Sequence, residues 1–241
     1  MMKKSKLISL MIFLLVVPAT LILGSRMDGR WYYLTSTLMI AELLIPFFLA
    51  FEGRKPQARE LVVIAVMCAL AVVARVAIPI PSFKAIFAII MIAGIAFGPE
   101  SGFLVGAVSA LASNFFYTQG PYTPWQMMAY GVGGMLAGYL FFKGHLKRKP
   151  LVMGIFGFLC VLLVVGPLLD TCTVFLAPIT LNWKNISALY ISGFPVNVSQ
   201  GLCTFAVLLL LGRPLLDKLD RIKVKYGMME DGNGIGTVPS G

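Results

Sequence analysis

Long apolar runs that contain almost no charge constrain this chain more than any other feature of its sequence. Hydrophobic residues make up 59% of the 241 residues and charged residues only 12%, which is about half the charged share of an ordinary soluble domain. A helix needs about 20 mostly apolar residues to cross a bilayer. Eight candidate spans occur, two of them short, at residues 7–23, 33–51, 61–78, 85–97, 101–117, 125–142, 151–171 and 187–211. The sequence therefore predicts an all-α integral membrane protein of about eight spans and excludes a soluble enzyme.

Proline and glycine predict how the chain is divided. Pro56 separates the first two spans from the other six, so we expect an amino-terminal two-span hairpin at 1–53 and a six-helix membrane core at 54–225. The first span is long for a signal peptide, and no clear cleavage site follows it, which favours an uncleaved helix. Gly98 and Pro99 predict a tight turn, and hence a helical hairpin, between the two short spans. The tail at 226–241 has no apolar period and is expected to be disordered.

The basic residues predict the orientation of the spans. Of the twenty lysines and arginines, fifteen fall on one side of the predicted membrane: Lys3, Lys4, Lys6, Arg54, Lys55, Arg59, Lys143, Lys147, Arg148, Lys149, Arg213, Lys218, Arg221, Lys223 and Lys225. The other side holds Arg26, Arg30, Lys84 and Lys184, and Arg75 lies within a span. Because cytoplasmic loops are enriched in basic residues, both termini are predicted to be cytoplasmic. The net charge of +10 is thus a topology signal and does not indicate nucleic-acid binding.

Polar side chains gather at the outer ends of the six core spans, whereas the cytoplasmic halves contain few. Polar groups are costly in hydrocarbon and usually line a water-filled cavity, so an outward-facing polar pocket is predicted. For any single residue, a place in the membrane interface is the alternative. The charged members Arg75 and Asp170 either pair with each other or contact a ligand. The candidate substrate-binding residues are Asn114, Tyr117, Gln119, Tyr122, Trp125, Gln126, Arg75, Asp170, Asn197 and Gln200.

The loop at 118–125 is the most distinctive segment of this polar layer. Gly120, Pro121 and Pro124 predict a rigid turn that leads into Trp125 and Gln126. Aromatic faces beside amide side chains suit a largely apolar ligand that carries a few hydrogen-bonding groups. A passive turn without contact to a ligand is the alternative.

Small residues at helical spacing form a second pattern. They occur at Ala65 and Ala69, and at glycines in several later spans. Such faces let helices approach closely. Packing within this chain explains most of them, and the alanine face at 61–78 is instead a candidate for contact with another subunit.

The residues that catalysis would need are missing from the sequence. His145 is the single histidine and lies in a basic loop, and no nucleotide-binding or metalloprotease motif occurs. Cys68, Cys160, Cys172 and Cys203 lie in or beside apolar stretches without metal-ligand spacing, which favours core thiols. No enzyme activity, cofactor or metal is predicted. A stand-alone secondary transporter that uses Glu42 or Asp170 for proton coupling is an alternative function.

Three segments carry a resemblance to a known family. They are residues 57–62 (Gln-Ala-Arg-Glu-Leu-Val), 97–103 (Phe-Gly-Pro-Glu-Ser-Gly-Phe) and 120–127 (Gly-Pro-Tyr-Thr-Pro-Trp-Gln-Met). The chain resembles the substrate-binding S components of energy-coupling factor (ECF) vitamin transporters, most closely the cobalamin-specific branch. The resemblance covers the six core spans, and the first two spans precede the six that are usual in the family.

The resemblance implies a function and partners. An S component captures a vitamin at the outer face of the bacterial plasma membrane. It associates with a transmembrane coupling subunit and two ABC ATPases, and ATP-driven toppling carries the substrate inward. Ala65 and Ala69 match the family's docking face for the coupling subunit. Cobalamin or a related corrinoid is the expected substrate, and another micronutrient is the alternative.

Overall fold

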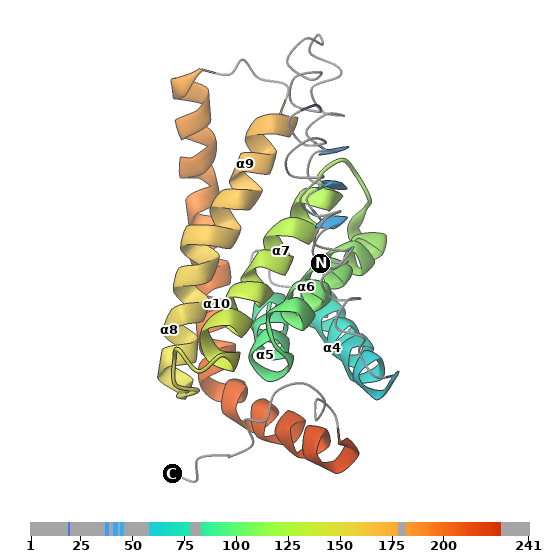
Figure 1. The fold of residues 1–241 in the computed structure, drawn as a ribbon. Coiled ribbons are helices and arrows are strands. Elements are labelled where there is room, and N and C mark those ends of the chain that lie inside the picture. Colours follow the sequence, from blue (N-terminus) through green and yellow to red (C-terminus); the bar gives the residue numbers. More distant parts are fainter. Residues whose placement is uncertain are drawn as a thin grey trace.

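Helices form all the regular structure in the part of the chain that the structure describes. The computed structural model describes residues 58–77, 83–177 and 182–227, together with Ala19, Thr37, Leu38, Ala41, Glu42, Leu44 and Ile45. The elements are α4 (Ala58–Val76), α5 (Ile86–Phe97), α6 (Pro99–Tyr117), α7 (Thr123–Ala137), η2 (Gly138–Phe142), α8 (Pro150–Cys160), η3 (Val161–Val165), α9 (Gly166–Leu176) and α10 (Trp183–Tyr226) (Figure 1). The all-α prediction is confirmed for these residues.

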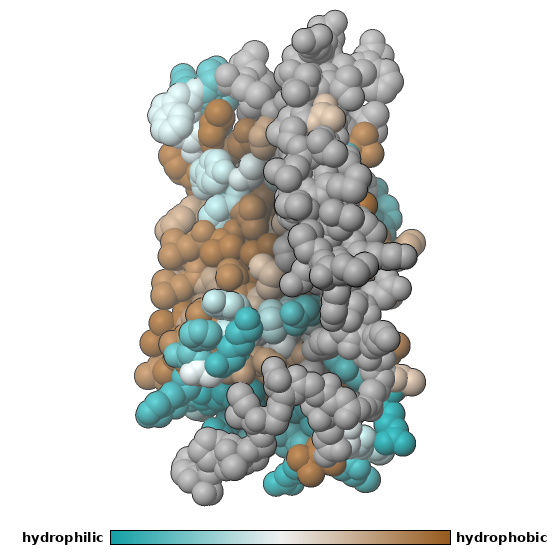
Figure 2. Space-filling model, in the orientation of Figure 1, coloured by the Kyte–Doolittle hydropathy of each residue, from teal (hydrophilic) through white to brown (hydrophobic). Residues whose placement is uncertain are grey.

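Other parts of the predicted topology lie outside the described residues. These parts are the span at 7–23 apart from Ala19, most of the span at 33–51, and the tail beyond residue 227. Among the residues that the structure describes, two helices are long and apolar enough to cross a membrane, Pro150–Leu176 and Trp183–Tyr226. Figure 2 shows hydrophobic side chains across the middle of the side formed by α8, α9 and α10, with hydrophilic ones toward both ends. The count of eight spans and the side of the termini remain predictions.

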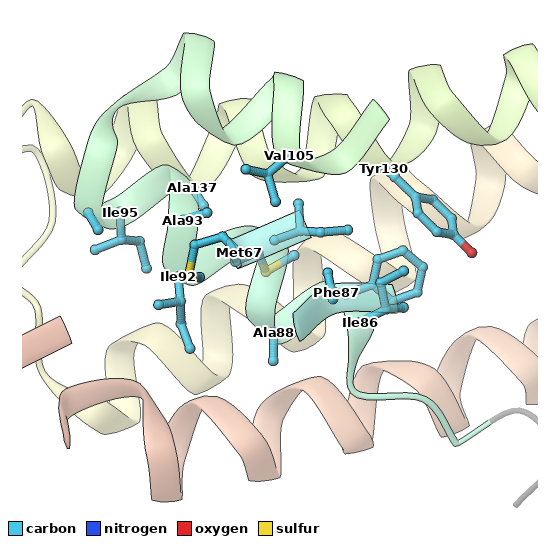
Figure 3. Packing of buried hydrophobic residues seen from close by; sticks show 14 of the residues in the cluster. Met67, Ile86, Phe87, Ala88, Ile92, Ala93, Ile95, Val105, Tyr130 and Ala137 are labelled. Atoms are coloured by element: carbon cyan, nitrogen blue, oxygen red, sulfur yellow. The ribbon is translucent and has the colours of Figure 1, made fainter. Parts of the chain in front are cut away.

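The central helix of the bundle is α5. Eleven of its twelve residues are buried, and it contacts α4, α6, α7 and α10 (Figure 3). Phe87 packs edge-on against Tyr130, with ring centroids 4.7 Å apart. At about 1.5 Å per residue, twelve residues extend only about 18 Å, less than the roughly 30 Å of a bilayer core. The predicted span at 85–97 is therefore better described as a short helix surrounded by protein.

The predicted helical hairpin is confirmed. Helix α5 ends at Phe97, and Pro99 begins α6. Between them Gly98 has φ of 96°, a conformation that a Cβ atom disfavours, and its amide donates to the Gly94 carbonyl at 2.9 Å. The turn thus depends on both residues, because glycine permits the backbone and proline starts the next helix.

Glycines let α5, α6 and α7 pack backbone to backbone. A Cβ atom at Gly94 or at Gly102 would overlap the carbonyl oxygen of Gly134, and one at Gly134 would overlap the carbonyl oxygen of Gly102. These close approaches confirm that most of the predicted small-residue faces serve packing within this chain. The same packing fixes the relative positions of the helix ends on which the site is built.

Helix α10 is longer than the predicted span at 187–211. It continues to Tyr226 and contains Pro195 and Pro214. Its last part turns across the base of the bundle (Figure 1), and Pro214 explains the bend because proline removes a helical hydrogen bond. The helix continues past the apolar run because Leu216 and Leu219 are buried against the other helices. Hydropathy indicates where an apolar segment ends, but it does not indicate that the helix continues beyond that point as an amphipathic segment.

Charged side chains of this bent part cap α5 at the basic end of the bundle, the end that holds residues 143–149 and 213–226. Lys223 donates to the Ala96 carbonyl at 2.8 Å, and Arg148 donates to the Ile95 carbonyl at 3.1 Å. Asp220 bridges the two cations, 2.6 Å from Lys223 and 3.3 Å from Arg148. Because the last carbonyls of a helix lack intrahelical partners, these cations stabilise the end of α5.

Candidate functional site at the polar end of the bundle

The part of the bundle away from the basic end holds the carboxyl ends of α4, α6 and α9 and the amino ends of α7 and α10, with the ends of α9 and α10 farthest from the basic end in Figure 1. We call it the polar end. Most of the ten predicted substrate-binding residues lie in its helix ends or in the loop at 118–122, and Asn197 and Gln200 lie deeper along α10. The predicted polar layer is therefore brought to one end of the fold.

Asn114 is the centre of a hydrogen-bond network at the polar end. It is fully buried on α6, and its Nδ2 donates to Gln126 Oε1 at 2.8 Å and to Thr123 Oγ1 at 3.2 Å. Its Oδ1 accepts from Arg75 Nη1 at 2.9 Å. A buried amide must find such partners or incur a desolvation cost. Asn114 thus joins three helices, α4, α6 and α7, in one network.

Arg75 is held by α6 on two sides. Its guanidinium also donates to Ser113 Oγ, and it lies over the rings of Tyr117 and Tyr130, at 5.0 Å and 5.6 Å from their centroids. The Tyr117 hydroxyl in turn donates to the Arg75 carbonyl at 3.0 Å. Within the described residues Arg75 makes no ion pair with Asp170, so the alternative in which these two residues pair is wrong.

The loop at 118–122 forms a turn, as predicted, and it is held by several hydrogen bonds. The Tyr122 hydroxyl donates to the Thr118 carbonyl at 2.6 Å. Gln119 donates to the Leu111 carbonyl at 3.0 Å and accepts from Thr123 Oγ1 at 2.9 Å. The Gly120 amide donates to Thr123 Oγ1 at 3.2 Å. The side chain of Gln119 is therefore engaged in shaping the turn.

Trp125 differs from the rest of the polar end. Its side chain is only 5% exposed and stacks on Phe175 of α9, with centroids 5.5 Å apart and an interplanar angle of 26°. Cys172 and Tyr122 complete this aromatic cluster. Among the described residues, Trp125 Nε1 is the buried side-chain donor left without a hydrogen-bond partner. Buried polar atoms are rarely unpaired, so this N–H is an exception among the described side chains.

Phe175 is a member of this cluster that sequence reasoning missed. It lies four residues after Thr171, and residues at this spacing share a helix face. The spacing from Thr171, a polar residue near the same end of the predicted span, was the available signal for placing Phe175 beside the site. Nothing in an apolar run, however, indicates which phenylalanine meets a tryptophan from another helix.

The remaining predicted residues form a second group, between α9 and α10. Asn197 Nδ2 donates to Asp170 Oδ2 at 2.8 Å, and the Thr171 and Tyr190 hydroxyls are 2.8 Å apart. Gln200 lies on α10 three residues after Asn197 and is half-buried. In the described part of the chain, no hydrogen bond links this group to the Arg75–Asn114 network. The structure thus separates the ten residues into two groups, with the stack of Trp125 on Phe175 bridging α7 and α9.

The two predicted docking residues lie elsewhere, on α4. Ala65 and Ala69 are exposed, and Val62, Val66 and Val73 on the same helix are also exposed. The opposite face of α4 packs into the core through Ile64, Met67, Cys68 and Ala71. Helix α4 therefore has a free apolar face that contains both alanines. Cys68, Cys160, Cys172 and Cys203 are free and buried, as predicted.

Comparison with protein families identifies the kind of membrane protein to which this architecture belongs. The family described as the S component of the ECF-type riboflavin transporter matches residues 55–218. The chain belongs to this family. No significant match was found among curated proteins or among solved structures.

Membership has direct consequences for the interpretation of the fold and the site. An S component is the vitamin-binding membrane subunit of an ECF transporter, associates with a coupling subunit and ATPases, and is not an enzyme. The predicted S-component assignment is thereby confirmed. The predicted cobalamin branch is not supported, because the matching family is described by riboflavin transport. Two of the three segments that carried the resemblance, 57–62 and 97–103, lie at the start of α4 and in the turn between α5 and α6, and only the segment at 120–127 lies at the polar end.

Proposed function

We propose that this S component captures riboflavin, or a closely related flavin, at its polar end. The observation that carries the proposal is the family match over residues 55–218. The buried stack of Trp125 on Phe175 with its unpaired donor supports it independently. Cobalamin, expected from the sequence, is the substrate against which the proposal is tested.

The two parts of a flavin match the two chemical environments of the polar end. The isoalloxazine ring is flat and aromatic and has carbonyl and ring-nitrogen acceptors. It suits the aromatic cluster around Trp125, where Nε1 would donate to one of these acceptors. The ribityl chain carries hydroxyl groups, which suit the carboxylate and amide oxygens of Asp170, Asn197 and Gln200. An aromatic cluster with a few placed polar groups is typical of a small-molecule site.

The Arg75–Asn114 network has a supporting role in this proposal. Asn114, Gln126 and Gln119 already satisfy one another or the turn, and Arg75 is held by α6 and by Tyr117. These residues place Tyr122 and Trp125 at the start of α7. The network keeps the aromatic cluster in position, because ligand sites depend on polar groups held in place by their neighbours.

Energy for transport comes from the partner subunits in this proposal. The exposed face around Ala65 and Ala69 would dock the transmembrane coupling subunit, because small side chains allow close helix contact in lipid. Two ATPases would then drive toppling of the S component and release of the vitamin to the cytoplasm.

The direct test is a titration of the purified protein in detergent with riboflavin, followed by the quenching of flavin fluorescence. Saturable binding of one riboflavin per chain in the absence of ATP is expected. Cobalamin is titrated in parallel by calorimetry, and no binding is expected. Binding of cobalamin without riboflavin would restore the substrate expected from the sequence, and binding of neither would refute capture of a flavin.

The docking face is tested by the double substitution Ala65→Leu with Ala69→Leu. We expect loss of assembly with the coupling subunit and loss of uptake, while riboflavin binding by the isolated chain is retained. Ala188→Leu is the matched control, because Ala188 is an exposed alanine on α10. Normal assembly of the double variant would exclude this face as the docking site.

A further inference from the structure

The segment around Thr37 to Ile45 precedes the family match at 55–218, yet it contacts the polar end. All six described residues of this segment are helical, and they lie beside α6 and α7 in Figure 1. Two of them make contacts that bear on the proposed ligand site. The segment lies outside the residues that match the family, so a role for it does not follow from the family match.

The described residues of the segment show one-sided packing. Thr37 and Leu44 are seven residues apart, which places them on nearly the same face of a helix at about 100° per residue. Leu44 is 5% exposed, whereas Leu38 and Ile45 are 46% and 45% exposed. The face that carries Thr37 and Leu44 therefore meets the bundle, and the neighbouring face does not.

Thr37 contacts the 118–122 turn. Its hydroxyl donates to the Pro121 carbonyl at 3.1 Å. Pro121 lies between Gly120 and Tyr122, in the turn that leads into the aromatic cluster. A hydrogen bond to a loop carbonyl restrains that loop, because the carbonyl gives up a partner when it moves.

Leu44 contacts α6 and α7 deeper in the bundle. It packs in a cluster with Phe103 and Ala107, against which Met127 and Met128 also pack. Met128 packs at the same time against the cluster of Trp125 and Cys172. Met128 therefore lies between the cluster that contains Leu44 and the cluster that contains the tryptophan whose N–H is unpaired.

We infer that Thr37 and Leu44 are positioning residues for the ligand site: Thr37 restrains the 118–122 turn, and Leu44 supports Trp125 through Met128. This inference rests on the proposed function for its effect on a ligand. The segment leaves Ala65 and Ala69 exposed, so it acts at the polar end and not on the docking face. The two contacts are of different kinds: Thr37 makes one hydrogen bond to the turn, and Leu44 makes apolar contacts within its cluster.

The test compares Leu44→Ala with Ile45→Ala in the full chain, by the rate at which bound riboflavin dissociates. Leu44→Ala is expected to raise the dissociation rate about tenfold, because loss of a buried leucine loosens its neighbours and affinity changes appear mainly in this rate. Ile45→Ala is expected to change it by less than about twofold, since exposed side chains add little. Assembly with the coupling subunit is expected to be unchanged in both variants.

A second pair of variants tests the restraint on the turn and guards against a Leu44 variant that fails to fold. Thr37→Val, which lacks the donor, is expected to raise the dissociation rate about threefold, and Thr37→Ser to leave it within about twofold of the original. A structural role alone would lower thermal stability with valine and leave the dissociation rate of riboflavin unchanged. Equal rates for valine and serine, or for Leu44→Ala and Ile45→Ala, would overturn the inference.

A readout without ligand separates this inference from the proposed function. In a chain with Trp31→Phe and Trp183→Phe, the fluorescence reports Trp125 alone. Leu44→Ala is expected to increase acrylamide quenching of Trp125, whereas Ile45→Ala is not. If riboflavin fails to bind but this difference is found, the proposed function fails and the positioning role stands. If the quenching is the same in both variants, the positioning role fails.

Discussion

The two ends of the helix bundle use their polar groups in opposite ways. At the basic end, Lys223 and Arg148 bind the last carbonyls of α5, and Asp220 lies between the two cations. At the polar end, the cation Arg75 is engaged with α6, and a buried donor on Trp125 has no partner. The cations at the basic end thus have hydrogen-bond partners within the protein, whereas at the polar end the Trp125 N–H has none.

Under the proposed function, this difference distinguishes an end that stabilises the fold from an end that binds the ligand. Cations that cap helix carbonyls lower the free energy of the folded state and leave little capacity for a ligand. An unpaired buried N–H raises that free energy until an acceptor arrives. In the proposed function, a ligand acceptor bound to Trp125 Nε1 would recover this cost, whereas the described cations around α5 at the basic end already have partners.

The largest expected effect on stability comes from disrupting the close packing of α5, α6 and α7, on which both ends of the bundle depend. Gly134→Ala is expected to destabilise the protein by about 3 kcal/mol or more and to prevent folding, because its Cβ would overlap the backbone of Gly102, which cannot move aside. Gly133→Ala is the matched control. Its Cβ would lie 3.0 Å from a Val165 methyl, which is able to shift, at a cost of about 1 kcal/mol.

Size-exclusion profiles and thermal unfolding in detergent measure both glycine variants. A well-folded Gly134→Ala protein would contradict the backbone contact on which both ends depend.

A smaller effect is expected from Lys223→Met at the basic end. Lys223 is mostly buried, with 16% of its side chain exposed, and loss of its charged hydrogen bonds is expected to cost about 2 kcal/mol of unfolding free energy. Arg213→Met is the control. Arg213 pairs with Asp217 at a site where both side chains are more than half exposed, and such pairs contribute less than about 0.5 kcal/mol.

The unfolding free energies of the two variants are measured by reversible unfolding in mixed micelles, and their affinities for riboflavin by titration. Both variants are expected to bind riboflavin as the original chain does. A loss of affinity with Lys223→Met would show that the ends are not independent.

The smallest of these effects, and the most diagnostic, is at the polar end. Trp125→Ala is expected to weaken riboflavin binding by at least about tenfold, or roughly 1.4 kcal/mol, while the chain remains folded. Trp125→Phe retains an aromatic face without the donor and is expected to weaken binding by about fivefold, the value of one hydrogen bond. Trp183→Ala is the control, since Trp183 is 83% exposed. Unchanged affinity with Trp125→Ala would remove Trp125 from the site.

Much of the fold followed from hydropathy and a few turn residues. The apolar runs predicted the helices from α4 to α10, and Gly98 with Pro99 predicted the hairpin of α5 and α6. The exceptions have physical causes. The shortness and burial of α5 depend on the helices around it, and the extension of α10 depends on Leu216 and Leu219 reaching the core. The order of residues in the sequence does not show which helices surround α5 or that Leu216 and Leu219 reach the core.

The candidate site was predicted in part. The outer-end residues were identified by the contrast between polar and apolar helix ends, and the structure brings them to one end of the bundle. Their separation into two groups, and the parts played by Phe175 and Met128, were not predicted. A phenylalanine or methionine in an apolar run gives no signal until the helix that faces it is known.

The sequence by itself determined the class of this protein, because apolar runs of about 20 residues with so few charges are typical of helices that satisfy their own backbone polar groups in lipid. It also determined that one end is basic and the other rich in amides and aromatic rings. The tertiary structure decided which polar groups are already paired and which remain available. Asn114 and Trp125 look equally suited to a ligand in the sequence, but their neighbours come from other helices, and only the packing pairs the amide and leaves the indole N–H free.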